Sequence, residues 1–404
     1  MLKRRLAMFF SLALLLSSLS VAEAGPASDP DSLSATSIPH YRRLNNFATT
    51  TPTGYSPQRI RHAYGIDQIA NHGGGQIVAI VDAFDDPNIA ADLGVFNTQF
   101  SLTQMNGTPG HAACTVAAGP HPCFEKQFSN GLPPTDTGWA SEIALDVEWS
   151  HVIAPAADIL LVEAKSNSNA DLYAAVDVAS ASGAHVVSMS WGGREPFNAS
   201  STDVHFRKSG VTFFASSGDS GNGASYPATS PNVVSVGGTS LKLDASSNVV
   251  AETAWSGSGG GISARETEPG YQTSFGITTS TGKRPFPDVS YNANPASGVP
   301  VYDSFGVGGW GQFGGTSAGS PQWAAIVALV DQIRAAGPLS SNSLVSSAEY
   351  SAAVGANYAL NYRDIVAGTN GSCGAVCSTN VGYDFVTGLG SPIANKLIPF
   401  LATH

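Results

Sequence analysis

Charged residues, and basic residues above all, are scarce in this sequence. Asp, Glu, Lys and Arg make up 12% of the 404-residue chain, against roughly 25% in typical soluble domains. The 19 Lys and Arg are scattered and outnumbered by 30 Asp and Glu, which gives a formal net charge of -11. We therefore expect no nucleic-acid partner and no attraction to anionic membranes. A surface with few charges is also compatible with an acidic medium, because little is lost when carboxylates become protonated.

Long apolar runs are equally rare, and the only one lies at the N-terminus. Lys3, Arg4 and Arg5 precede the apolar stretch 6–21, and an A-x-A cleavage site follows at 22–24. We predict a signal peptide over residues 1–24 and hence a secreted protein; the alternative is an uncleaved anchor. Because no second run approaches the ~20 residues of a membrane span, we expect no stable membrane association.

Cysteine is limited to four residues, which allow three disulfide connectivities. We expect the bridges Cys114–Cys123 and Cys373–Cys377, because each pair is close in sequence and separated by loop-type residues. Metal binding is the alternative. It is disfavoured because the paired histidines of a zinc site are missing near Cys373 and Cys377.

The chain is organised as an arm followed by one domain. Residues 25–53 are rich in Pro, Ser and Thr and predict a linker or short N-terminal arm, which leaves 54–404 as the domain. Continuous apolar strands alternating with helices predict an α/β fold, with a parallel β-sheet covered by helices on both faces. Active sites of such sheets lie at the carboxyl ends of the strands. The predicted strands cover 76–81, 159–162, 185–189, 211–214 and 233–236, and the predicted helices cover 88–100, 139–151, 170–182, 199–209, 317–336 and 392–401.

The segment from Gly314 to Pro321 carries the first candidate for chemistry. A Gly-Gly turn brings the Ser317 hydroxyl to the first turn of a buried, Ala-rich helix. Free backbone N–H groups and the helix dipole favour an anion there, so a serine nucleophile is stabilised as its charge develops. The alternative is an ordinary N-capping Ser or Thr before a core helix.

Three acidic residues are the further candidates. Glu142 and Asp146 are spaced i,i+4 and share one helix face with apolar flanks, so one pKa of the pair should rise and the two should share a proton. Such a pair is a general base for low pH. Asp219 follows an apolar strand in a Gly/Ser turn, and if protonated it can donate to an oxyanion. A solvated acidic face and an Asx turn are the respective alternatives.

With these residues the chain resembles the sedolisins, the serine-carboxyl peptidases with a subtilisin-like fold, from about Tyr55 to the C-terminus. The motifs that carry the resemblance are Glu142-x-x-x-Asp146, Ser216-Ser217-Gly218-Asp219, Ser258-Gly259-Gly260-Gly261-Ile262-Ser263, Arg284-x-x-Pro287-Asp288-Val289-Ser290 and Gly315-Thr316-Ser317-x-x-x-Pro321.

The resemblance implies an acid-active endopeptidase that takes peptide or protein substrates. Ser317 would be the nucleophile, Glu142 its base, Asp146 the partner that shares the proton, and Asp219 part of the oxyanion hole. By analogy with subtilisins, Ser190, Trp191 and Gly192 would line the substrate cleft as an edge strand for the peptide. We expect the protein to be a monomer.

The resemblance also implies one structural Ca²⁺ ion bound by the loop 364–384. Asp364 and Asp384 would supply carboxylates, and Ile365, Asn380 and Gly382 backbone carbonyls. Hard oxygen ligands with two charges suit Ca²⁺. The alternative is that the two aspartates only cap loops.

Two departures from the family pattern keep rival functions open. Sedolisins carry a long N-terminal propeptide, whereas only residues 25–54 separate the predicted signal peptide from Tyr55; we expect no such segment here. This leaves open an inactive, exported binding protein on the same scaffold. Asp82 ends a predicted strand where subtilisins place their triad aspartate, and His111 loosely imitates their histidine motif. A conventional Asp82/His111/Ser317 triad is therefore the main rival.

Overall fold

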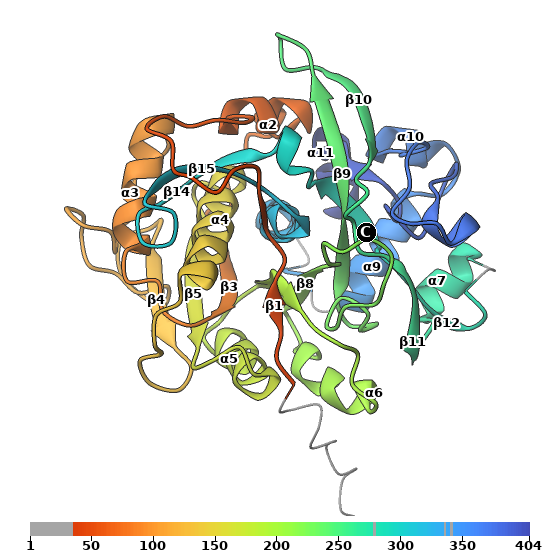
Figure 1. Cartoon of the computed structure of the whole chain (residues 1–404), viewed down its shortest axis with the longest axis horizontal. Coiled ribbons are helices and arrows are strands. Elements are labelled where there is room, and N and C mark those ends of the chain that lie inside the picture. The colour runs from red at the N-terminus through yellow and green to blue at the C-terminus, as the bar shows by residue number, and fades with distance from the viewer. Residues whose placement is uncertain (1–34, 278–279, 335–336, 340–341) are drawn as a thin grey trace, which may run out of the picture.

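The computed structural model describes residues 35–277, 280–334, 337–339 and 342–404 (Figure 1). The predicted signal peptide at 1–24 lies outside the described residues. The predicted arm at 25–53 is described from residue 35 onward. No helix of the described chain is both long and apolar enough to cross a membrane.

A largely parallel β-sheet forms the centre of the molecule and confirms the predicted α/β fold. Its strand order is β10-β9-β8-β6-β3-β5-β4, and β13 pairs with β9. Neighbouring strands of this sheet are parallel from β9 across to β4, and only β10 is antiparallel to its neighbour. The bounds are β3 Ile77–Ala83, β4 Phe124–Phe128, β5 Asp158–Ala164, β6 Val186–Met189, β8 Thr212–Ser216, β9 Val234–Leu243, β10 Val249–Ala254 and β13 Val289–Asn292.

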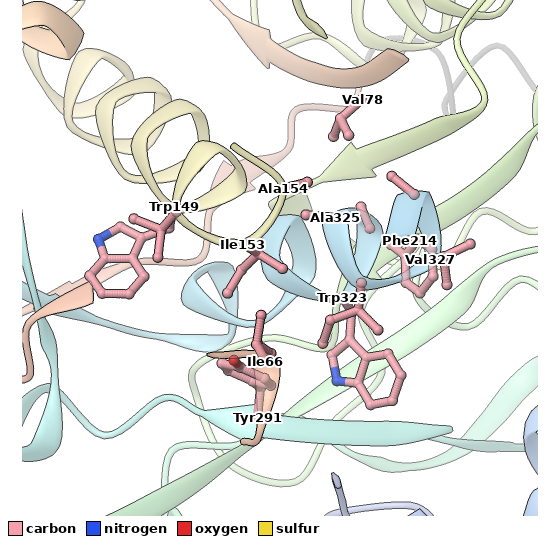
Figure 2. Close-up of a cluster of buried hydrophobic side chains, with 14 of the residues drawn as sticks. Ile66, Val78, Trp149, Ile153, Ala154, Phe214, Tyr291, Trp323, Ala325 and Val327 are labelled. Atoms are coloured by element: carbon pink, nitrogen blue, oxygen red, sulfur yellow. The ribbon is translucent and has the colours of Figure 1, made fainter. Parts of the chain in front are cut away.

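Helices cover both faces of this sheet, as its continuous apolar strands predict. The pleat of β3 sends Val78 and Ile80 into one hydrophobic cluster with α4 (Thr137–Ile153) and α8 (Ser320–Ile333). Ala79 and Val81 point into a second cluster with α5 (Asn169–Ala181). Figure 2 shows side chains of the first cluster, contributed by β3, β8, β13, α4 and α8. The sheet is therefore held from both sides, and its strand ends are fixed in position.

Helix α4 is buried on every side and carries two of the candidate acids. The Asp136 side chain caps its first turn by accepting hydrogen bonds from Gly138 and Trp139 N–H, both at 2.9 Å. Every residue from Trp139 to Ile153 is buried. Trp149 (Figure 2) also donates from its indole nitrogen to the Pro300 carbonyl at 2.9 Å. Truncating it to Ala should cost about 3–5 kcal/mol of stability.

The remaining helices and the hairpins close the molecule around the sheet. The segment 240–315 contains two further antiparallel strand pairs, β11 with β12 and β14 with β15. The bounds are α2 Pro57–Ala63, α3 Ile89–Phe100, α6 Ala199–Thr202, α7 Gly270–Phe275, α9 Asn342–Ala352, α10 Tyr358–Asn361, α11 Ala394–Leu401, β11 Gly261–Thr267, β12 Lys283–Phe286, β14 Val299–Asp303, β15 Gly309–Gly314, β16 Tyr362–Arg363 and β17 Ser391–Pro392.

Two predicted helices differ from the observed ones. The predicted helix 199–209 is wrong as a single element, because α6 stops at Thr202 and a 3-10 turn follows. Asp203 there accepts hydrogen bonds from Tyr226 and Ser230, which hold the chain in that turn. The predicted helix 317–336 begins at Ser320 instead and ends at Ile333, since Pro321 occupies its first turn.

The Arg284-to-Ser290 motif is explained by a buried ion pair. Arg284 and Asp288 are both fully buried and meet through two contacts, at 2.6 and 3.1 Å. Asp288 also accepts from the Ser235 N–H at 2.8 Å. The bidentate pair joins Arg284 of β12 to Asp288 at the start of β13, and the bond from Ser235 N–H ties Asp288 to β9.

Both predicted disulfides, Cys114–Cys123 and Cys373–Cys377, are present. The described part of the arm is extended. Its strand β1 (Ile38–Pro39) pairs with β7 (Trp191–Gly192), and β2 (Arg42–Arg43) pairs with β15. The sequence did not indicate either pairing.

Candidate active site

The structure brings the four predicted catalytic residues together at the carboxyl ends of the strands. Glu142 and Asp146 lie on α4, Asp219 follows β8, and Ser317 lies in a 3-10 turn between β15 and α8. All four are buried. The Ser317 hydroxyl donates to Glu142 Oε2 at 2.8 Å, and the Ser190 carbonyl oxygen lies 3.2 Å from it. A hydroxyl and a carboxylate thus share a hydrogen bond that is shielded from water.

Gly315 explains the tight turn that presents Ser317. Its φ of 95° lies in the left-handed region, where glycine is favoured. A Cβ at this position would overlap the His40 carbonyl oxygen and come within 2.5 Å of Asp219 Oδ2. Because α8 begins only at Ser320, the Ser317 N–H is not used inside the helix and donates to the His40 carbonyl at 3.1 Å.

The acid pair is held without a compensating cation. Burial, followed by the neighbouring carboxyls of Asp146 and Asp82, raises the pKa of Glu142 well above its ordinary value. Burial and then Asp82 likewise raise the pKa of Asp146. None of the three carboxyls forms an ion pair with a described Lys, Arg or His. They cannot all be ionised together, so at least one proton is shared within the group.

Asp82 is the acid whose position sequence reasoning misjudged. It is fully buried near the end of β3, and burial raises its pKa to about 8. Neither of its carboxyl oxygens has a hydrogen-bond partner among the described residues. Its place at the carboxyl end of a buried strand was the available signal. The structure adds it to the acid pair as a third carboxyl, whereas the sequence had suggested a partner of His111.

The rival Asp82/His111/Ser317 triad is wrong. His111 is exposed in the loop after α3 and borders a surface hollow of about 680 Å³. Asp82 and Ser317 have no accessible surface. The hydrogen bonds of the Ser317 hydroxyl go to a carboxylate and a carbonyl, and none among the described residues goes to an imidazole.

The two carboxyl oxygens of Asp219 have different surroundings. Its Oδ1 accepts from the Thr316 N–H at 2.8 Å and from the Thr316 hydroxyl at 2.9 Å. Burial raises its pKa to about 7. The other oxygen, Oδ2, has no hydrogen-bond partner among the described residues and lies 3.9 Å from Nε of Arg42, whose charge lowers the pKa of Asp219 and so opposes the effect of burial. When the carboxyl is protonated, an O–H at Oδ2 can donate to a carbonyl oxygen or an oxyanion beside Gly315.

Ser190, Trp191 and Gly192 form an edge beside the serine, and β7 consists of the last two. The Trp191 indole donates to the Val81 carbonyl at 2.7 Å, which anchors the edge to β3. A Cβ on Gly192 would overlap the Ser225 hydroxyl, so glycine keeps the adjoining pocket open. That pocket measures about 300 Å³, and Ser217, Gly218, Asp219 and Ser225 are among its lining residues.

The predicted calcium ligands lie in the segment 364–384, where backbone N–H groups bind the two aspartates. Gly382 N–H donates to Asp364 Oδ2 at 3.0 Å, and Asn380 N–H lies 3.4 Å from Asp384 Oδ2. Neither carboxylate forms an ion pair with a described cation. Burial raises the pKa of Asp384 to about 6. Asp384 Oδ1 also accepts from the Val386 and Thr387 N–H groups, both at 2.8 Å, and Asp364 Oδ1 accepts from the Tyr358 hydroxyl at 3.0 Å, so both aspartates cap this loop. Carboxylate and carbonyl oxygens are also the ligand types that fit a hard cation such as Ca²⁺.

Three comparisons relate the chain to known proteins. The model of the subtilase family matches residues 110–372. Kumamolisin from Bacillus sp. (strain MN-32) is 28% identical over 393 residues, which cover 87% of this chain and 64% of kumamolisin. Sedolisin from Pseudomonas sp. (strain 101) is 31% identical over 220 residues, covering 48% and 35% of the two chains. This chain therefore spans less than two thirds of the length of these relatives.

The fold is also that of a solved member. The structure of Pseudomonas sedolisin (serine-carboxyl proteinase), complexed with two molecules of pseudo-iodotyrostatin, matches with a TM-score of 0.72 and 25% identity. The match covers 88% of this chain and 99% of that one. The chain belongs to the subtilase family and, within it, to the sedolisins.

Proposed function

We propose that the protein is an acid-active serine-carboxyl endopeptidase. The single observation that carries the proposal is the buried 2.8 Å hydrogen bond from the Ser317 hydroxyl to Glu142 Oε2, beside Asp146 and Asp82. When a carboxyl pair shares one proton, its second carboxyl stays ionised and can accept a proton in acid, where an imidazole would already be protonated.

The proposed reaction uses groups of this chain alone. Ser317 attacks the carbonyl carbon of a bound peptide while Glu142 accepts the hydroxyl proton. Asp146 then shares this proton with Glu142. The Ser317 N–H and the protonated Asp219 donate to the oxyanion. Glu142 then hands the proton to the leaving amine, and water releases the acyl group by the same steps in reverse order.

The pH range of activity follows from two opposite requirements. Glu142 must be able to accept a proton, which sets the acid limit. Asp219 must keep its proton in order to donate, and its pKa of about 7 sets the alkaline limit. Activity should therefore peak in acid and fall as the pH rises through about 7.

The proposal includes a calcium site and export. Asp364, Asp384 and the carbonyls of Ile365, Asn380 and Gly382 would hold one Ca²⁺, which would fix the C-terminal loop by binding its oxygen ligands. The signal peptide predicted at 1–24 and the two disulfides fit a secreted protein. The catalytic domain would comprise 54–404 and act as a monomer on peptide or protein substrates.

The test is hydrolysis of a denatured protein between pH 3 and pH 8, with Ser317→Ala as the matched control. We expect fragments from the unaltered protein only, with maximal rate below pH 6. A rate that climbs toward pH 8, or equal fragmentation by both forms, would refute the acid-pair mechanism.

A further inference from the structure

Three loops meet where Asp219 is held, and one of them comes from the C-terminal part of the chain. We call residues 217–223 the Asp219 loop and residues 256–261 the glycine-rich loop. Backbone hydrogen bonds join these two loops: Gly259 N–H donates to the Gly218 carbonyl at 2.7 Å, Gly221 N–H to the Gly257 carbonyl at 2.9 Å, and Gly223 N–H to the Gly260 carbonyl at 3.0 Å. The position of Asp219 therefore depends on what holds the glycine-rich loop.

Asn370 joins both loops to the C-terminal segment. Its backbone carbonyl accepts from the Asn222 N–H of the Asp219 loop at 2.8 Å, and its Nδ2 donates to the Ser258 carbonyl of the glycine-rich loop at 2.9 Å. Its own N–H donates to the Cys377 carbonyl at 3.0 Å, beside the disulfide Cys373–Cys377. Asn370 is buried, so these bonds are shielded from water.

The side chain of Asn370 is two hydrogen bonds away from the backbone of Asp219. Its Nδ2 binds the carbonyl of the peptide unit between Ser258 and Gly259, and the N–H of the same unit donates to the Gly218 carbonyl at 2.7 Å. That carbonyl belongs to the peptide unit that enters Asp219. Because a peptide unit is planar and rigid, the orientation of its carbonyl also fixes the orientation of its N–H.

The loops are packed too closely for the Asp219 loop to shift while these bonds are kept. A Cβ on Gly221 would lie 2.5 Å from the Asn370 carbonyl oxygen, so backbone lies directly against backbone there. Ser258 Oγ also donates to the Val386 carbonyl at 3.0 Å, which is a second tie to the C-terminal part of the chain. Losing the Asn370 side chain should therefore loosen the glycine-rich loop without detaching it.

We propose that Asn370 is a positioning residue for peptide hydrolysis: its side chain holds the glycine-rich loop, and this loop keeps the Asp219 carboxyl in place to donate to the oxyanion. The inference rests on the proposed peptidase function. Asn222, Gly259 and Asp219 are among the lining residues of the pocket of about 300 Å³. Asn370 binds the first two loops through hydrogen bonds and acts on the reaction through them.

The first experiment is a double-mutant cycle on kcat, measured with a quenched peptide at pH 4 to 5. The four forms are the unaltered protein, Asn370→Ala, Asp219→Ala and the double variant. We expect Asn370→Ala to lower kcat about tenfold when Asp219 is present, the effect of one buried hydrogen bond. When Asp219 is absent the loss should be less than about twofold, because the donor that Asn370 positions is gone.

Thermal unfolding of the same four forms separates positioning from folding. Asn370→Ala should lower Tm by the same amount in both backgrounds, since its bonds do not involve the Asp219 side chain. A loss of about tenfold in kcat in both backgrounds would mean that Asn370 only supports the fold, and it would overturn the assignment. An unchanged kcat in the presence of Asp219 would overturn it as well.

Two further variants test the hydrogen bond itself. Asn370→Asp has the shape of Asn, and at pH 4 its buried carboxyl should be protonated and able to donate to the Ser258 carbonyl. Ser378→Ala removes a hydrogen bond to the Gly374 carbonyl at 2.9 Å within the same C-terminal segment. Both variants should keep kcat within about twofold at pH 4, whereas the loss of the Asn370 donor should cost about tenfold. A tenfold loss in either variant would contradict the role of this donor.

The outcomes also separate this inference from the proposed function. If the unaltered protein hydrolysed no peptide, the proposed peptidase would be wrong and the positioning role with it. If the unaltered protein were active and the losses from Asn370→Ala and Asp219→Ala simply added, only the positioning role would be wrong.

Discussion

Replacing Glu142 by Gln separates the chemistry of the site from its structure. Gln has nearly the same shape, and its carbonyl oxygen can still accept the hydrogen bond that Ser317 now donates to Oε2 at 2.8 Å. It cannot accept the proton. Members of a catalytic triad act as a unit, and losing the base of one costs about 10⁴-fold or more in kcat. We expect a loss of that size, with KM almost unchanged.

The same substitution should make the protein more stable at neutral pH. Glu142 is fully buried beside two other carboxyls, and its pKa is raised in the folded state. At pH 7 an unfolded Glu is ionised, whereas the folded chain has to keep protons in this cluster. The neutral amide removes that conflict, so the unfolding free energy at pH 7 should rise by on the order of 1 kcal/mol, or about 2 °C in Tm. At pH 4 the difference should vanish.

Glu148→Gln is the matched control. Glu148 lies on the same helix α4, is also fully buried with a raised pKa, and accepts from the Tyr302 N–H rather than from Ser317. Its substitution should reproduce the gain in Tm at pH 7 and leave kcat within about twofold. The assay is steady-state hydrolysis of a quenched peptide beside thermal unfolding at pH 4 and 7. If Glu142→Gln retained more than a few per cent of kcat, the assignment of the base would be wrong.

Four further predictions follow from the same structure. Asp219→Asn donates at every pH, so the fall in kcat/KM through about pH 7 should disappear in this variant; persistence of that fall would exclude Asp219 as its cause. Burial raises the pKa values of Asp82 and Glu163 to about 8, so the folded chain binds more protons than the unfolded one and thermal stability should decline as the pH rises from about 4 to 8; a Tm that increases over this range would contradict the burial. A chelator should lower Tm in the unaltered protein but not in Asp384→Asn, and an equal response of the two would argue against the calcium loop. His111→Ala should keep kcat within about twofold, because its side chain is exposed and outside the site; a large loss would revive the histidine.

The sheet and the acid pair could be read from the sequence because both depend on local periodicity. Short apolar runs alternating with helical patterns predict a covered parallel sheet. The i,i+4 spacing of Glu142 and Asp146 places both on one helix face wherever that helix packs. The sequence also marks the start of α8, since Pro321 favours the first turn of a helix, whereas the predicted helix begins at Ser317.

The arm and the third carboxyl depend on contacts that periodicity does not record. Strand β1 is two residues long and pairs with residues more than 150 positions away in the chain, so its sequence reads as a linker. Asp82 follows an apolar strand and is indistinguishable from a turn residue until α4 is packed over its carboxyl. His40 likewise finds its partner only when β8 is placed beside the arm, where Ser216 Oγ lies 2.8 Å from His40 Nδ1.

Helix α4 gives the site an unusual mechanical property. Glu142 and Asp146 lie on a helix that is buried from Trp139 to Ile153, and the Asp136 side chain caps its first turn. A surface loop can move away from a substrate, but α4 cannot move without disrupting the packing of the hydrophobic core. Regulation of such a site therefore has to act by blocking or opening the cleft beside Ser317, rather than by moving Glu142 and Asp146.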